Sequence, residues 1–238
     1  MNDMFASVTT LLFDYGGTLD TDGRHWSHVL WDAWQAAGAP VDEPAFREAY
    51  VHGERYLGSH EVILPEDDFH EVLLKKVALE LSACGFSSGE PQTEAYRQYI
   101  AGYCNGYVQR NMQETKRVLS GLKGRYKIGL VSNFYGNIRS VLKGYGLDGF
   151  FSEVVESAEV HIRKPDPAIY ALGLERMGAT PGETVVVGDA FGKDILPAKQ
   201  LGCKAVWLKG ETWKPEHNDE TIPDAVISHF SQLTGLLL

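Results

Sequence analysis

The segment that decides the fold is Thr10–Asp20, which reads TLLFDYGGTLD. Its apolar run ends at Asp14, and two glycines and a threonine follow one residue later. This pattern is typical of a buried strand that delivers a carboxylate to a tight turn. Open parallel sheets bind their ligands at the carboxyl ends of their strands, so Asp14 is well placed for chemistry. Taken alone, a simple turn-capping role for Asp14 explains the segment almost as well.

A helical block of about ninety residues follows this segment, as the spacing of its apolar residues indicates. Glycine and proline divide the block into four amphipathic helices. The expected helices are one that runs from Trp26 to Gly38, a second that Asp42 opens and that carries Leu57, a third from near Pro65 to before Gly85, and a fourth after Pro91 that includes Tyr107. We interpret their aromatic residues as core, and the block as an all-helical insertion.

Beyond Val118 the chain alternates helices with short β-rich runs. The runs are Lys127–Ser132, Glu153–Glu156, Thr184–Val187 and Ala205–Leu208, with Asp224–Ile227 as an edge strand and Phe230–Leu238 as a terminal helix. Strict alternation of strands and helices implies a parallel sheet with right-handed crossovers. The strand before Asp14 belongs to the same sheet.

These patterns predict an α/β fold with two parts. A Rossmann-like parallel-sheet core comprises residues 1–21 and 113–238, and an inserted helical cap comprises residues 22–112. The cap is expected above the ends of the strands, where its residues set specificity. Trp26, His25 and Tyr56 are candidates for that role.

Polar residues follow a second apolar strand at Ser132 and Asn133, just before a helix that begins near Ile138. A turn from strand to helix places backbone N–H groups and the positive end of a helix beside the hydroxyl, which suits a phosphate. Capping of the helix is the simpler explanation of either residue alone.

Two further segments carry charge. Lys164 is followed by Pro165, and Pro167 suits the first turn of the next helix, so the ammonium group is held on a rigid loop. Asp189 ends another apolar strand, and Asp194 follows it on the loop or first helical turn. This pair is an oxygen-rich site fit for Mg²⁺. A helix cap would explain Asp194 but not Asp189.

In their order along the chain, the four segments resemble the motifs of the haloacid dehalogenase-like hydrolase superfamily. The likeness covers essentially the whole chain and is closest to members with a helical cap between the first and second motifs. It implies that Asp14 is the nucleophile of a covalent aspartyl intermediate. Ser132 would bind the transferring group and Lys164 would balance its charge. Thr18 and Asn133 would complete the substrate site.

The resemblance also implies a cofactor and a substrate class. Mg²⁺ would lie between the Asp14 carboxylate, the Gly16 carbonyl and Asp189, with Asp194 bound directly or through water. The expected reaction is Mg²⁺-dependent hydrolysis of a small phosphorylated metabolite.

Gly16 departs from the family pattern. Phosphatases of this family carry a second aspartate at this position, which protonates the leaving oxygen. Glycine cannot transfer a proton, and loss of a general acid typically costs roughly 10²- to 10⁴-fold in rate. Either another group supplies the proton, with Asp20, Asp22, His25 or a cap side chain as candidates, or the leaving group needs none. We therefore expect faster turnover of activated phosphates than of alkyl phosphates.

Three alternatives follow from the same departure. Family members without the second aspartate cleave carbon–halogen or carbon–phosphorus bonds. The dehalogenases do not need the metal site that Asp189 and Asp194 form. The carbon–phosphorus hydrolases use a cap lysine as a Schiff base, and only Lys75 or Lys76 could serve, both expected on the solvated face of their helix. A non-catalytic relative that binds Mg²⁺ and phosphate is the third alternative.

Composition bounds the partners and the location. The 238 residues are 44% hydrophobic, and 22 Lys+Arg against 32 Asp+Glu leave a formal net charge of -10. This charge argues against a nucleic-acid or anionic-membrane surface. Cys84, Cys104 and Cys203 lack metal or redox spacing and are expected as buried free thiols. With no signal-like or membrane-spanning segment, the prediction is a cytoplasmic monomer or homodimer.

Overall fold

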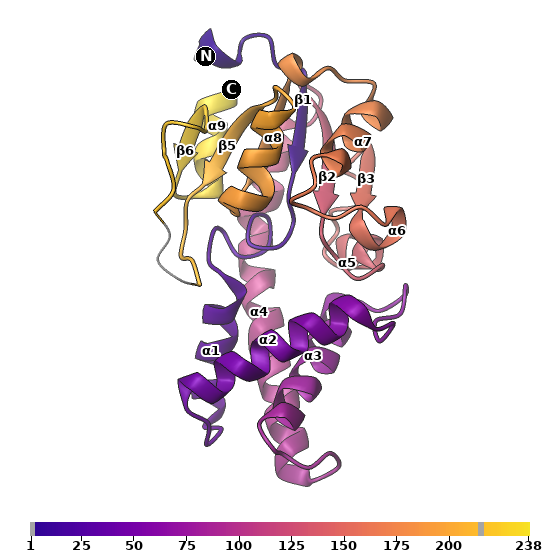
Figure 1. Cartoon of the computed structure of the whole chain (residues 1–238), viewed down its shortest axis with the longest axis vertical. Coiled ribbons are helices and arrows are strands. Elements are labelled where there is room, and N and C mark those ends of the chain that lie inside the picture. The colour runs from indigo at the N-terminus through magenta and orange to yellow at the C-terminus, as the bar shows by residue number, and fades with distance from the viewer. Residues whose placement is uncertain (1–2, 214–216) are drawn as a thin grey trace.

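A computed structural model describes residues 3–213 and 217–238. Its core is a six-stranded sheet in the order β3-β2-β1-β4-β5-β6, with every pair of neighbouring strands parallel. The strands are β1 (Thr10–Phe13), β2 (Lys127–Ser132), β3 (Glu153–Glu156), β4 (Thr184–Gly188), β5 (Lys204–Leu208) and β6 (Ala225–Ile227). Figure 1 shows this α/β part above a separate block of helices. The predicted fold class is confirmed.

Strand β1 lies in the interior of the sheet, with both of its faces and both of its edges covered. Phe13 pairs in register with Leu130 of β2 and with Val187 of β4. Leu11 and Phe13 face one apolar cluster, whereas Leu12 faces the other. A strand buried on both faces reads as a continuous apolar run, which is why Thr10–Phe13 could be recognised.

Helices cover both faces of the sheet. One face packs against α7 (Ala168–Met177) and α8 (Leu196–Gln200), and the other against α5 (Ile138–Gly144), α9 (Leu233–Leu237) and the end of α4. Short elements complete this part: η1 (Asp3–Phe5), α6 (Ser157–Val160), η2 (Pro181–Glu183), the π-helical turn η3 (Phe191–Ile195) and η4 (Phe230–Gln232). The predicted terminal helix therefore forms as η4 followed by α9.

The helical block consists of α1 (Trp26–Ala37), α2 (Glu43–Ser59), α3 (Phe69–Ala83) and α4 (Pro91–Leu122). Helix α3 begins four residues after Pro65, where it was expected, because Asp68 caps it in a reciprocal capping box with Glu71. Helix α4 is 32 residues long and runs from the block up along the sheet (Figure 1). The division at residues 112 and 113 stays a prediction, since α4 crosses it without a break.

The thiols and the hydropathy of the helices test two further expectations. Cys104 and Cys203 are buried, but Cys84 is only half-buried, so the prediction of three buried thiols is wrong for Cys84. It lies at the C-terminal end of α3.

Among the described residues, none of the helices combines the length and the apolar character needed to cross a bilayer.

Candidate functional site

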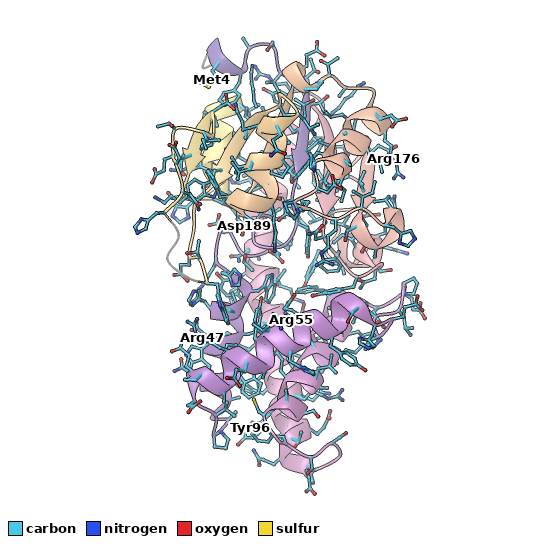
Figure 2. The ribbon with its side chains drawn as sticks, viewed as in Figure 1. Met4, Arg47, Arg55, Tyr96, Arg176 and Asp189 are labelled. Atoms are coloured by element: carbon cyan, nitrogen blue, oxygen red, sulfur yellow. The ribbon has the colours of Figure 1, made fainter. Side chains whose placement is uncertain are left out.

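The polar residues at the ends of β1, β2 and β4 meet at one edge of the sheet. These three strands are neighbours, so Asp14, Asn133 and Asp189 emerge side by side. The backbone N–H of Asp14 donates to the carbonyl of Val187 at 2.9 Å, which extends the pairing of β1 with β4 up to the site. In Figure 2, Asp189 lies at the edge of the α/β part that faces the helical block.

Lys164 joins this edge from the loop before α7. Its Nζ donates to Asp14 Oδ1 at 2.5 Å and to Asp194 Oδ1 at 2.8 Å, with all three side chains buried. Asn133 holds the lysine backbone on both sides: the Lys164 N–H donates to Asn133 Oδ1 at 2.9 Å, and Asn133 Nδ2 donates to the Lys164 carbonyl at 3.0 Å. The loop therefore delivers a fixed cation to Asp14.

Thr18 connects the first and last segments of the site. Its hydroxyl lies 3.3 Å from Asp14 Oδ2 and 3.1 Å from Asp189 Oδ1, and it accepts a hydrogen bond from the Asp189 N–H at 3.0 Å. Gly17 makes this approach possible. It has a φ of +93°, and a Cβ at this position would lie 2.3 Å from Asp189 Oδ2. Only glycine fits there.

Asp14, Asp189 and Asp194 form a carboxylate cluster with one oxygen of each within 4.8 Å of the others. Burial raises the pKa of Asp14 to about 6, against the opposing effect of Lys164. Burial and then the charges of Asp14 and Asp194 raise the pKa of Asp189 well above its ordinary value. One ammonium group cannot balance three crowded carboxylates. The donor set therefore fits a divalent cation with oxygen ligands.

Two further side chains lie at this edge of the sheet. Ser132 is buried at the end of β2, and its neighbour Asn133 lines the cavity above Asp14. Tyr170 of α7 was not among the predicted site residues, yet its hydroxyl donates to Asp194 Oδ1 at 2.8 Å. A tyrosine among the apolar residues of this helix was the sequence feature that could have indicated this contact.

A cavity of about 210 Å³ separates the carboxylate cluster from the helical block. Gly16 lines its sheet end, and the helical block contributes His25, Trp26, Tyr50, Glu54 and Lys76. Tyr56 does not line it, because its ring stacks on His60 at a centroid distance of 4.0 Å. Of the three candidates for specificity, Trp26 and His25 thus line the cavity and Tyr56 does not.

The two cap lysines differ from each other in exposure. Lys76 is buried, forms an ion pair with Glu54 and lies 4.6 Å above the Tyr50 ring. Lys75 is half-buried and donates to Asp67 and to the Val62 carbonyl. The expectation of a solvated position is wrong for Lys76, whereas Lys75 remains partly solvated. The Glu54 carboxylate also accepts a hydrogen bond from Tyr135 at 3.2 Å, so a polar network joins α2, α3 and the loop after β2 at the cavity.

The candidate proton donors separate into two groups. Asp22 is excluded by position, since its carboxylate accepts from the Phe230 N–H at 2.6 Å and lies outside the cavity lining. Asp20 and His25 line the cavity. Burial raises the pKa of Asp20 to about 7, but Gly17 N–H and Trp26 Nε1 already donate to its two oxygens. Burial lowers the pKa of His25 to about 4, which keeps it neutral.

Glu80 lies fully buried in the helical block near Lys76, and this predicts a pH-dependent stability. Burial raises the pKa of Glu80 from 4.5 to about 7, against the opposing effect of Lys76. The folded protein then binds more protons than the unfolded chain between these values, so the free energy of unfolding falls as pH rises through this window. The contribution is about 3 kcal/mol. We expect Glu80→Gln to remove it and to stabilise the protein at pH 8.

Urea unfolding of both proteins at pH 5 and pH 8 measures the difference. Glu61→Gln is the matched control, because Glu61 is an exposed glutamate of the same block. An unchanged pH dependence in Glu80→Gln would show that Glu80 is ionised in the folded protein.

Comparison with known proteins identifies the family of this chain. Residues 8–202 match the haloacid dehalogenase-like hydrolase family. The chain is 34% identical to pyrophosphatase PpaX of Listeria welshimeri over 98% of both chains. It is also 36% identical to the glyceraldehyde 3-phosphate phosphatase of Methanothermobacter thermautotrophicus, over 54% of this chain and 59% of that one. A third relative, the Danio rerio haloacid dehalogenase-like hydrolase domain-containing protein 3, is 35% identical over 47% of this chain and 46% of its own. The chain thus spans about half the length of these last two relatives.

Solved structures show the same fold. The L-2-haloacid dehalogenase RSc1362 superposes with a TM-score of 0.64 at 21% identity, covering 98% of this chain and 99% of its own. The HAD-hydrolase YfnB from Bacillus subtilis superposes with a TM-score of 0.58 at 17% identity, covering 97% and 98%. Since the family match covers most of its length, this chain belongs to the haloacid dehalogenase-like hydrolases.

Proposed function

We propose that this hydrolase is a Mg²⁺-dependent phosphatase of small phosphorylated metabolites that works through an aspartyl phosphate on Asp14. The observation that carries the proposal is the buried lysine shared by two carboxylates, with Lys164 Nζ at 2.5 Å from Asp14 Oδ1 and 2.8 Å from Asp194 Oδ1. It holds Asp14 in one orientation at the bottom of a cavity and keeps a cation beside the oxygen atoms that would attack. Phosphatase names among the relatives support the same activity.

In the first step, an oxygen of Asp14 attacks phosphorus, the bond from phosphorus to the leaving oxygen breaks, and that oxygen keeps the electron pair. In the second step, water attacks the same phosphorus and its bond to Asp14 breaks, which restores the carboxylate. The proton released by water ends on the phosphate product. Lys164 offsets the charge that builds up on the phosphoryl oxygens in both steps.

The residues proposed to hold Mg²⁺ are Asp14, Asp189 and Asp194, with the carbonyl of Gly16. The three crowded carboxylates support this assignment. A bound Mg²⁺ would neutralise phosphoryl charge and orient the substrate. Around it, Thr18, Ser132 and Asn133 are proposed to contact the phosphoryl group. A monomer or homodimer in the cytoplasm, without nucleic-acid or membrane partners, remains the prediction from composition.

Lys76 lines the cavity, so it is the lysine that the carbon–phosphorus alternative would require. A Schiff base needs a neutral amine. The ion pair with Glu54 instead raises the pKa of Lys76 well above its ordinary value, against the opposing effect of burial. The lysine therefore stays charged, and phosphate transfer remains the better supported function.

A substrate panel with and without Mg²⁺ tests the proposal. It contains phosphate esters, a phosphonate aldehyde and a haloacid. We expect release of phosphate from the esters only, and only with Mg²⁺. Asp189→Asn should weaken Mg²⁺ binding by about tenfold or more, as measured by calorimetry. Cleavage of the haloacid, or Mg²⁺-independent turnover, would contradict the proposal.

A further inference from the structure

Two cations of the cavity have no partner in the site. Arg163 and Lys193 both line it, from the loop before α7 and from η3. Within residues 3–213 and 217–238, neither side chain forms a hydrogen bond or an ion pair. The other two lysines of the cavity differ, because Lys164 is shared by Asp14 and Asp194 and Lys76 pairs with Glu54. Arg163 and Lys193 are therefore the cations that remain available to a ligand.

Arg163 is directed toward the helical block. A Cβ at Gly58 of α2 would lie 3.8 Å from Arg163 Nη1, so the guanidinium group reaches from the loop before α7 to α2. Lys193 lies next to Asp194 in the chain and also borders a second cavity with His25. An anion that extends from the phosphoryl site toward the cap would meet both groups.

Over the residues that the structure describes, the cavity holds two unpaired cations, but it has no free carboxyl group or imidazole that is set to protonate a leaving oxygen above Asp14. Gly16 has no acidic group, Asp20 accepts two hydrogen bonds, and His25 accepts at Nδ1 from the Ser27 N–H at 3.2 Å. An alkoxide is a poor leaving group without a proton, because a general acid contributes roughly 10²- to 10⁴-fold. A phosphate anion departs without one.

We propose that the cavity selects phosphoanhydrides, in which the leaving group is itself a phosphate held by Arg163 and Lys193. This inference rests on the proposed function, since Asp14 still accepts the phosphoryl group. With inorganic diphosphate, Asp14 attacks one phosphorus, the bridging P–O bond breaks, and the bridging oxygen leaves with the electron pair as part of phosphate. No proton is needed for that departure.

Four probes separate the charge of the leaving group from its need for a proton. In the intact substrate, the leaving portion of inorganic diphosphate is charged and that of acetyl phosphate is uncharged, and both depart as stable anions without a proton. The leaving portion of phosphoglycolate is charged and that of ethyl phosphate is uncharged, and both depart as alkoxides that need a proton. We expect the highest kcat/KM for diphosphate and the lowest for ethyl phosphate.

Arg163→Gln and Lys193→Gln test the binding of the anion. Each should raise KM for diphosphate and phosphoglycolate by about tenfold, because a charge-assisted hydrogen bond is lost. KM for acetyl phosphate and ethyl phosphate should stay unchanged, which excludes an indirect effect on Lys164 or Asp194. Arg176→Gln and Lys143→Gln are the matched controls, since both side chains are exposed and lie outside the cavity lining. Figure 2 shows Arg176 at the outer edge of the α/β part.

The outcomes distinguish this inference from the proposed function. Turnover of acetyl phosphate that equals or exceeds that of diphosphate, or variants that affect all four probes alike, would overturn the inference and leave the phosphatase intact. Absence of turnover with every probe would overturn the proposed function. In that case, a measurement of ligand affinity tests the inference. Methylenediphosphonate, at saturating Mg²⁺, should bind about tenfold tighter than inorganic phosphate and lose this preference in Arg163→Gln. Equal affinities for methylenediphosphonate and inorganic phosphate would overturn the inference.

Discussion

Asp14→Asn is expected to lower kcat by about 10⁴-fold or more, because the residue that forms the covalent intermediate is lost. The fold should remain. Asparagine has the same shape, Lys164 keeps its hydrogen bond to Asp194, and the cluster loses one of three crowded carboxylates. Activity with the preferred substrate is the measurement, and circular dichroism and urea unfolding verify the fold.

Asp22→Asn is the matched control for this change. Asp22 belongs to the same N-terminal segment but contacts the Phe230 N–H and His229 rather than the cavity. Its replacement should leave kcat unchanged. Residual activity of Asp14→Asn within about tenfold of the original would show that another group attacks the substrate.

Gly16→Asp is expected to raise kcat for ethyl phosphate by roughly 10²- to 10⁴-fold, because it restores a proton donor beside the leaving oxygen. The structure has room for the side chain: a Cβ at Gly16 meets no atom within 4 Å, and its φ is not in the left-handed region. The turn thus requires glycine at residue 17 but not at residue 16. Turnover of diphosphate should change little, since its leaving group needs no proton.

Gly16→Asn is the matched control, because asparagine has nearly the same size but cannot donate an acidic proton. Steady-state kinetics of both variants with ethyl phosphate and diphosphate separate acid catalysis from a change in shape. An equal gain in both variants would contradict the assignment of Gly16 as a missing acid.

The three central strands β1, β2 and β4 could be predicted because each is a largely buried apolar run with a polar residue at its end or directly after it. Thr10–Phe13 and Lys127–Ser132 show this directly, and the parallel order brings their ends together without further information. The same logic explains why Asp14, Asn133 and Asp189 lie at one edge of the sheet. Residues that come from strand ends are thus accessible to sequence analysis.

The side of the cavity that the helical block forms could not be predicted in the same way, because it depends on how helices pack against one another. Lys76 follows Lys75 in the chain, and two adjacent lysines are typical of a solvated helix surface. Its partner Glu54 lies 22 residues earlier on another helix, so the ion pair exists only after α2 and α3 pack. Tyr170 escaped prediction for a related reason: its ring packs in the core while its hydroxyl reaches Asp194.

The most direct test is acid-quench labelling of Asp14 during turnover of ³²P-labelled diphosphate. Because Gly16 can neither protonate the leaving group nor activate the attacking water, the second step should be slow and the aspartyl phosphate should accumulate. We expect label in the peptide that contains Asp14, sensitive to hydroxylamine, and none in Asp14→Asn. Turnover without label, or label on another residue, would contradict covalent phosphoryl transfer through Asp14.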